Sequence, residues 1–167
     1  MRGERTPYSF RGVLRSDLPM LRRWLATPEV VAWWGDPAGQ AALLEEDLAN
    51  PLMVMRIVSH QGRPFAYAQD YDVHSWPQPH MARLAYGARA VDAFVGEPDM
   101  IGRGHGSLFL RLLARRLIRE GAPLVAIDPD VGNERARRAY ARAGFTGDQV
   151  VDTEAGPAVL MTFEGEA

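Results

Sequence analysis

The segment from Arg89 to Glu120 places the strongest constraint on the fold that this 167-residue chain can adopt. Its pattern predicts a strand over 89–95, a loop with glycines at positions 102, 104 and 106, and a helix over 104–120. In that helix Leu108, Leu112, Leu113 and Leu117 are expected on one face, with Arg111, Arg115 and Arg119 along another. The glycines form either an ordinary turn or a site for a phosphate, and the order of elements indicates an α/β domain.

The flanking sequence predicts the remaining elements. We expect strands over 8–14, 51–60, 63–73, 123–128, 144–152 and 158–163, and helices over 18–26, 28–34, 38–48 and 134–143. Ser16 or Asp17 can cap the first helix, and Asn133 the last, which Gly144 ends. Gln61-Gly62 indicates a hairpin turn, and 74–87 an irregular loop long enough to be functional. The expected fold is a mixed, mostly antiparallel sheet flanked by helices, in a single domain over 1–167.

Composition excludes several kinds of protein. The chain has no cysteine, so disulfides and thiolate metal sites are impossible, and His74, His80 and His105 lack ligand-like spacing with acids, so we expect no metal. A net charge of −2 argues against nucleic-acid binding as the main activity. No apolar run approaches the roughly 18 residues that a membrane span needs. We therefore expect a cytoplasmic protein without a membrane partner.

The charges are unevenly distributed. All 19 basic residues are arginine, and nine of them lie between Arg103 and Arg142, against four acids. From Glu29 to Asn50 there are five acids and no base. One region therefore suits an anionic ligand and the other a cationic one, unless both are simply solvated helix faces.

The glycines at 102, 104 and 106 suit a pyrophosphate. Without Cβ atoms they let the backbone approach a ligand closely, and the N–H groups at the helix start point toward an anion. The pattern is not the Rossmann fingerprint, because no repeating parallel βαβ series follows and no ribose-binding acid is evident. It is not a Walker loop, because the chain has no lysine.

Two patterns together resemble the GCN5-related N-acetyltransferase (GNAT) superfamily. That family's R/Q-x-x-G-x-G/A loop is matched at Gly104 and Gly106, with Ile101 where the family usually has Arg or Gln. Its N-x-x-A-x-x-x-Y-x-x-x-G-F segment is matched by the stretch from Asn133 to Phe145, including Tyr140. The resemblance implies the GNAT fold and acetyl-CoA as co-substrate.

A narrower resemblance is to the aminoglycoside 6′-N-acetyltransferases. It rests on RRWLATPEVVAWWGDP, FAYAQDY, VDAFVGEPDMIGRGHG and IDPDVGNERARRAYARAGF with the trailing EAGPAVLM. It implies direct acetyl transfer to a primary amine of a small polycationic molecule, in a ternary complex. His74 to Tyr86 matches no segment of that subfamily and would contact the substrate.

The resemblance also implies the site residues. Asp92 would orient the amine and accept its proton, and Tyr140 would present its phenol to the leaving sulfur. The residues expected to bind the co-substrate are Phe94, Val95, Ile101, Gly102, Arg103, Gly104, His105, Gly106, Ser107 and Asn133. Those expected to bind the acceptor are Trp34, Gln69, Asp70, Tyr71, Asp92 and Asp128, with Asp36 and Asp72 close to them in the sequence.

Simpler roles stay open for several of these residues. Asp92 can pair structurally with an arginine such as Arg89, Tyr140 can be packing, and Asp128 can cap a turn. One tryptophan of the Trp33–Trp34 pair is expected in the core.

Other functions also remain open. They are a siderophore-biosynthesis acyltransferase, in which a histidine would replace Asp92, another small-amine or peptide N-acetyltransferase, and an acetyl-CoA-binding module without turnover. The chain is expected to be a monomer or a homodimer.

Overall fold

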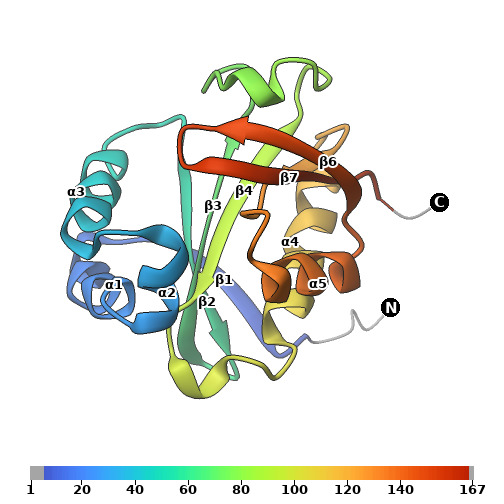
Figure 1. The fold of residues 1–167 in the computed structure, drawn as a ribbon. Helices are drawn as coiled ribbons and strands as arrows, with labels where there is room; N and C mark the ends of the chain where they lie inside the picture. The colour runs from blue at the N-terminus through green and yellow to red at the C-terminus, as the bar shows by residue number, and fades with distance from the viewer. Residues whose placement is uncertain (1–5, 166–167) are drawn as a thin grey trace. The chain divides into compact units, whose positions relative to one another are not determined.

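The computed structural model describes residues 6–165 and contains one mixed sheet of seven strands in the order β1-β2-β3-β4-β5-β7-β6 (Figure 1). The β4–β5 pair is parallel, whereas β1–β2, β5–β7 and β6–β7 are antiparallel. Helices flank the sheet, so the predicted fold class is confirmed.

The elements follow the predicted order. The strands are β1 (Tyr8–Gly12), β2 (Val54–His60), β3 (Arg63–Asp72), β4 (Arg89–Val95), β5 (Val125–Ile127), β6 (Thr146–Thr153) and β7 (Gly156–Phe163). The helices are α1 (Leu18–Leu25), α2 (Pro28–Trp34), α3 (Pro37–Asp47), α4 (His105–Arg119) and α5 (Glu134–Ala143). Three short 3-10 turns that the sequence analysis did not predict are η1 (Arg15–Asp17), η2 (Pro79–Met81) and η3 (Pro98–Met100).

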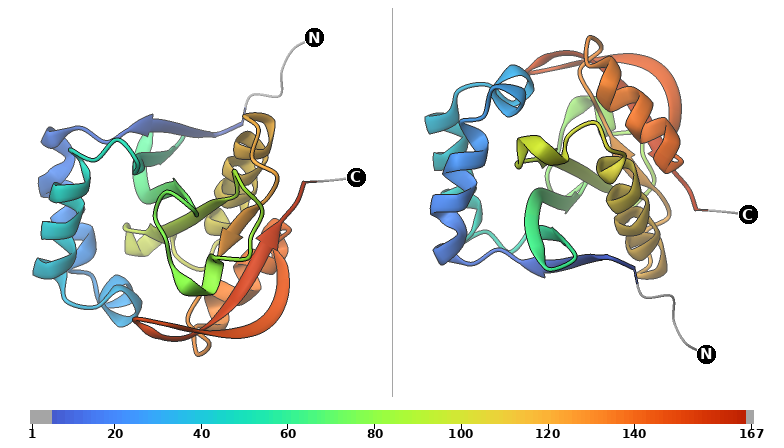
Figure 2. Two further views of the ribbon diagram at one scale, coloured as in Figure 1. Left: turned by 90° about the horizontal axis from the view of Figure 1, so that it is seen from above. Right: turned by 90° about the horizontal axis from the view of Figure 1, so that it is seen from below.

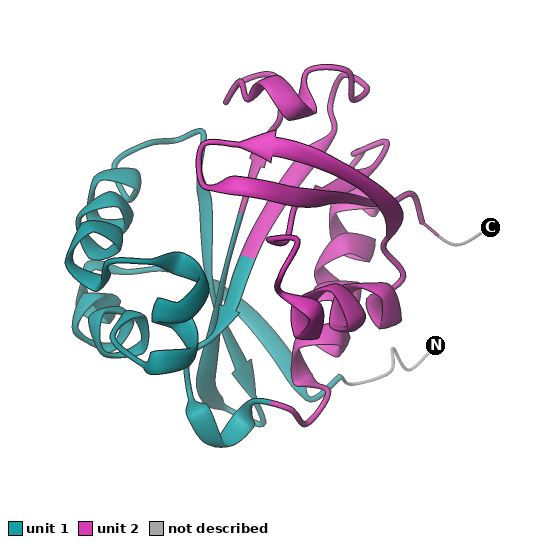
Figure 3. Ribbon diagram, viewed as in Figure 1, with its two compact units in different colours: residues 1–69, 93–101 teal, residues 70–92, 102–167 magenta. Residues whose placement is uncertain are grey.

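The chain divides into two compact units (Figure 3). Unit 1 comprises Met1–Gln69 and Ala93–Ile101, and unit 2 comprises Asp70–Asp92 and Gly102–Ala167. Strands β3 and β4 contribute residues to both units. The single domain expected from the sequence therefore remains a prediction, and each unit is described by itself.

Unit 1 contains α1, α2 and α3, with α1 packed against α3. The Trp24 side chain of α1 is fully buried, and its indole N–H donates to the carboxylate of Glu97 at 2.9 Å. Gly96 lies directly against this ring and has no room for a Cβ atom. Burial of so large an aromatic group stabilises the unit, because hydrophobic stabilisation grows with the apolar area removed from water.

Unit 2 contains α4 and α5, which lie side by side in both views of Figure 2. The buried face of α4 consists of Phe109, Leu110, Leu113, Ala114 and Leu117. Leu108 was expected on that face but is 53% exposed, so it lies beside the buried stripe, although Ser107 and Phe109 on either side of it are buried. None of the helices between residues 6 and 165 is long and apolar enough to cross a membrane.

The prediction that the Asp17 side chain caps α1 is wrong. Asp17 occupies the N-cap position, but its side chain makes no capping bond to the helix. Its carboxylate instead accepts two bonds of 2.7 Å from Arg11 and one of 2.8 Å from the N–H of Leu14. The Arg11 hydrogen bonds lower the pKa of Asp17, and burial opposes them only in part. By contrast, Asn133 caps α5 as predicted, through the N–H of Ala136.

Candidate functional site

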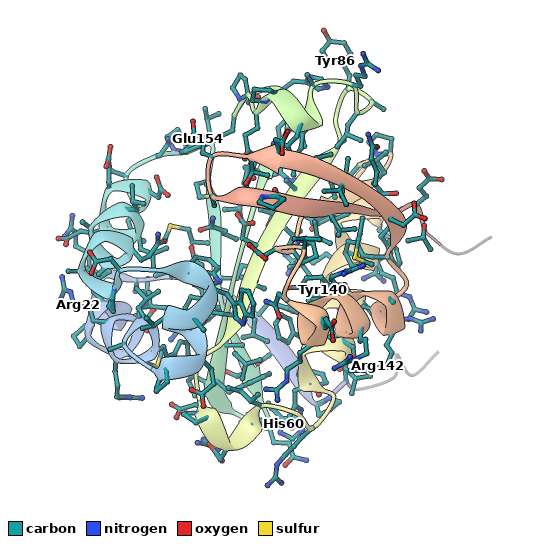
Figure 4. The ribbon with its side chains drawn as sticks, in the orientation of Figure 1. Arg22, His60, Tyr86, Tyr140, Arg142 and Glu154 are labelled. Carbon is teal, nitrogen blue, oxygen red and sulfur yellow. The ribbon has the colours of Figure 1, made fainter. Side chains whose placement is uncertain are left out.

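Two carboxylates and two phenols of unit 2 lie within electrostatic reach of one another. Burial raises the pKa of Tyr140, and the negative charges of Asp92 and Asp128 raise it further. Burial likewise raises the pKa of Tyr71, again with contributions from both acids. Tyr140 projects from α5 (Figure 4), Tyr71 from β3 and Asp92 from β4, and Asp128 follows β5. Both phenols therefore stay protonated at neutral pH, beside two acids.

Arg89 does not serve as the partner suggested for Asp92. Its Nε donates to Asp70 at 2.7 Å. Successive side chains of a strand point to opposite faces, so residues 89 and 92 of β4 project to different sides. Asp70 is only 1% exposed. The Asp70 carboxylate is thus buried and bonded to Arg89. The direct substrate contact expected for Asp70 stays a prediction.

Asp128 is held by a histidine that the sequence analysis did not assign to the site. The Nε2 of His80 lies 2.7 Å from the Oδ2 of Asp128, and the two side chains are 5% and 17% exposed. Burial raises the pKa of Asp128, and the bond to His80 opposes this effect. The pair could not be predicted from the sequence, because the two residues are 48 positions apart and only the folded loop brings η2 to the end of β5. Asp128 also has a backbone hydrogen bond, so the turn-capping role left open for it stands beside this contact.

Tyr71 is anchored by the loop over 74–87. Its hydroxyl accepts a hydrogen bond of 2.7 Å from the amide of Gln78, and its ring lies 6.0 Å from that of Trp76. The Nε2 of His74 bonds to the carbonyl of Leu84 at 2.7 Å, which closes the loop on itself. Tyr86, 89% exposed, lies near the outer end of the loop (Figure 4). The loop is thus tied to β3 and β5 by named side chains.

An aromatic cluster in unit 1 brings together three other predicted residues. The ring of Trp34 is 4.9 Å from that of Phe94, and Phe94 stacks on Tyr67 at 5.3 Å. The Tyr67 hydroxyl donates to the Oε1 of Gln69 at 2.7 Å, which fixes the orientation of that amide. Tyr67 was not singled out from the sequence. Trp33, by contrast, is 50% exposed, so Trp34 is the inner member of the pair.

Two acids considered near the substrate have local structural roles. Asp36 caps α3 through the N–H of Gly39 at 2.9 Å. Asp72 accepts from the N–H groups of His74 and Ser75, each at 2.9 Å, and the bond from Ser75 contributes most to lowering its pKa. Both carboxylates thus accept hydrogen bonds from backbone N–H groups of the segment that follows them.

The glycine loop has the geometry of an open backbone cradle. Gly104 is the N-cap of α4 with a φ of 83°, a left-handed conformation that favours glycine. A Cβ atom added at Gly102, Gly104 or Gly106 would meet no protein atom within 4 Å. Gly106 lacks a positive φ, so neither its own backbone nor its neighbours require glycine there. The first turn of α4 carries no acid, and its N–H groups have no carbonyl partner within the helix. These features fit a bound phosphate group.

The remaining residues expected to bind the co-substrate have mixed surroundings. The hydroxyl of Ser107 donates to the carbonyl of Gly104 at 3.0 Å, so this side chain is used within the first turn of α4. Arg103 is exposed and His105 partly buried. Ile101 and Val95 are partly buried members of unit 1, and the side-chain oxygen of Asn133 is used in the α5 cap.

The β4–β5 pairing is short. In the described part of the chain its register consists of Arg89 with Val125 and Ala90 with Ala126. β4 continues for five residues beyond this register, through Asp92 to Val95. The backbone of β4 from Val91 to Val95 is therefore outside the register with β5.

No group of three or more His, Cys, Asp or Glu side chains between residues 6 and 165 has an arrangement that could hold a metal ion.

Comparison with known proteins identifies the class. Residues 13–153 match the acetyltransferase (GNAT) domain family. The aminoglycoside N(6′)-acetyltransferase type 1 of Klebsiella pneumoniae is 30% identical over an alignment of 165 positions that covers 92% of this chain and 81% of the relative. The chain therefore belongs to the GNAT acetyltransferase family, and the predicted acetyl-CoA-dependent N-acetyltransferase class is confirmed.

Solved structures give the same relationship. The aminoglycoside acetyltransferase AAC(6′)-Ib in complex with coenzyme A and kanamycin has a TM-score of 0.82 and 29% identity, covering 94% of each chain. Its complex with ribostamycin and coenzyme A has a TM-score of 0.83 and 28% identity, covering 94% of this chain and 93% of that one. Another structure of that enzyme contains acetyl-CoA, the co-substrate that the sequence resemblance implies.

Proposed function

We propose that the protein transfers an acetyl group from acetyl-CoA to a primary amine of an aminoglycoside, with the 6′-amino group as the acceptor. The observation that most supports this proposal is the cluster in unit 2, where burial and the charges of Asp92 and Asp128 raise the pKa values of the Tyr140 and Tyr71 phenols. Two acids in a partly buried setting attract a cationic amine, and a protonated phenol beside them can donate a proton. The relatives that act on aminoglycosides support the acceptor class.

Asp92 is the proposed base. Acetyl transfer requires a neutral amine, oriented toward the thioester carbonyl, that loses a proton as the C–N bond forms. The Asp92 carboxylate orients the ammonium and takes its proton, directly or through a water. Its position on a strand rather than on a loop keeps that carboxylate in one place.

Tyr140 is the proposed acid. The C–S bond breaks as the new amide forms, and the departing thiolate needs a proton. Burial and the two nearby acids raise the pKa of Tyr140, so that its phenol holds a proton to donate at neutral pH. Water supplies that proton when the phenol is removed.

The glycine loop would bind the co-substrate. When bound, acetyl-CoA supplies the thioester and carries a pyrophosphate that suits the first turn of α4. The N–H groups of Gly104, His105, Gly106 and Ser107 would donate to it, Gly102, Arg103 and Ile101 would line its approach, and Asn133 would lie beside it. Phe94 and Val95 would hold the pantetheine arm through their backbone groups.

The remaining residues would bind the acceptor. Asp128 would bind a further amino group, Gln69 a sugar hydroxyl, and Trp34 and Tyr71 would present rings to the sugar faces. Asp70 would act through Arg89 unless the substrate displaces that contact. A cytoplasmic location and a monomeric or homodimeric state complete the proposal.

A thiol-release assay tests the proposal. Wild-type protein is supplied with acetyl-CoA and, in separate reactions, kanamycin, an aminoglycoside with a 6′-hydroxyl in place of the 6′-amine, a polyamine, a hydroxylamine and a peptide. We expect turnover with kanamycin that falls sharply for the 6′-hydroxyl compound. Equal turnover with the 6′-hydroxyl compound contradicts the regiochemistry, and turnover only with the hydroxylamine or the peptide contradicts the substrate class.

Replacing the proposed acid should have a moderate effect. We expect Tyr140→Phe to lower kcat about 10-fold, because water can protonate the thiolate, while the KM values for both substrates change little. Steady-state kinetics at pH 7 provide the measurement. An unchanged kcat would leave Tyr140 with a packing role only.

The glycine cradle can be tested by a graded series at one position. Gly106→Ala should leave the KM for acetyl-CoA within about threefold, because the family pattern admits Ala there. Gly106→Val should raise that KM at least about 10-fold by filling the space a phosphate needs, while helix propensity leaves the stability about equal to that of glycine. Thermal unfolding checks the stability, and an unchanged KM in the Val variant would exclude the cradle.

A further inference from the structure

We infer that His80 is a positioning residue that orients the Asp128 carboxylate toward an amino group of the acceptor. This inference rests on the proposed function, because it assigns Asp128 to the acceptor. The bond joins η2, inside the long loop, to the first residue after β5. His80 thus links the conformation of the loop to the direction of a substrate-binding acid.

The imidazole is placed firmly enough for such a role. Its side chain is 5% exposed, and the next residue, Met81, is 1% exposed. The turn that holds it packs against β6 on one side and is tied to Tyr71 through Gln78 on the other. A buried ring on a turn with contacts on two sides has little freedom to rotate away from the carboxylate.

The hydrogen bond controls what Asp128 can do. A bond of 2.7 Å to Oδ2 restricts the orientation of the carboxylate. Burial of Asp128 favours its protonated form, and the His80 bond favours the charged form. A cationic amine needs the charged form. Loss of the imidazole would therefore weaken binding of the acceptor without touching the proposed base at Asp92.

Two substitutions separate this role from packing. His80→Phe keeps a ring of similar size and removes the donor, whereas His80→Gln keeps a neutral N–H donor at the position of Nε2. We expect His80→Phe to raise the KM of kanamycin about 10-fold or more, with kcat and the KM of acetyl-CoA within about threefold. His80→Gln should restore the KM of kanamycin to within about threefold of wild type.

A double-mutant cycle tests whether the effect passes through Asp128. His80→Phe should add nothing to Asp128→Asn, because the two residues act as one unit. Thermal unfolding of each variant provides the folding control. The positioning role would be overturned if the effects of His80→Phe and Asp128→Asn on the KM of kanamycin were additive. It would also be overturned if His80→Phe lowered kcat by the same factor as it raised that KM.

The outcome is distinguishable from failure of the proposed function. If wild-type protein turns over kanamycin and His80→Phe matches it, the function stands and the inference is wrong. If wild-type protein acetylates only monoamines, the acceptor class is wrong. His80→Phe should then leave the KM of those monoamines unchanged, since they have no second amino group for Asp128 to bind, and an effect on them would overturn the inference as well.

Discussion

Asp92→Asn should lower kcat by about 10³-fold while changing the KM of acetyl-CoA by less than about threefold. The amide keeps the size of the side chain and its place on β4, but it cannot accept a proton from the amine. General-base catalysis by a positioned side chain contributes about 10² to 10⁴ in rate, which sets the magnitude. Steady-state kinetics with kanamycin and acetyl-CoA provide the measurement.

The matched control for this variant is Asp72→Asn. Asp72 has the same chemistry and is the last residue of β3, but its carboxylate accepts from the N–H groups that follow it. We expect it to retain at least about one third of wild-type kcat. Comparable losses in both variants would point to a general electrostatic effect, and wild-type turnover in Asp92→Asn would remove Asp92 from the chemistry.

Arg89→Met should destabilise the protein by about 3 kcal/mol. The variant removes the guanidinium from Asp70, which is 1% exposed, and removal of one partner of a buried ion pair costs about 3–5 kcal/mol. For a chain of this length the midpoint of thermal unfolding should fall by roughly 6 to 12 °C. Thermal or denaturant unfolding at neutral pH provides the measurement.

An exposed ion pair provides the control. Arg116 and Glu120 of the α4 region are joined at 2.9 Å, and their side chains are 44% and 53% exposed. Arg116→Ala should cost only about 0.3–0.5 kcal/mol, because water already solvates both charges. The double variant Asp70→Leu with Arg89→Met should recover most of the loss. A loss in Arg89→Met no larger than in Arg116→Ala would show that the buried pair contributes little.

Local patterns predicted most of the elements. The bounds of α2 and β4 match the expected ranges. A proline begins α2 and a pair of tryptophans ends it, and an alternating run of residues marks β4. The caps at Asn133 and Gly144 were also readable, because each depends on a few neighbouring residues. The sequence resemblance named the family that the comparisons confirm.

Contacts that join distant positions could not be predicted in the same way. His80 with Asp128 and Arg89 with Asp70 are separated by 48 and 19 positions, and no local rule sets either pairing. Tyr67 escaped notice because a strand tyrosine between alanines reads as core, and only the structure shows its hydroxyl on Gln69. The roles of Asp92 and Tyr140 remain predictions, now with a defined electrostatic setting.

The two faces of β4 have a consequence for how such an enzyme can diversify. Arg89 and Asp92 are three positions apart and project to opposite sides, so one face of a short strand bears a buried ion pair and the other the proposed base. Substitutions around Asp92 can then alter chemistry or acceptor choice without drawing on the stability that Arg89 and Asp70 supply.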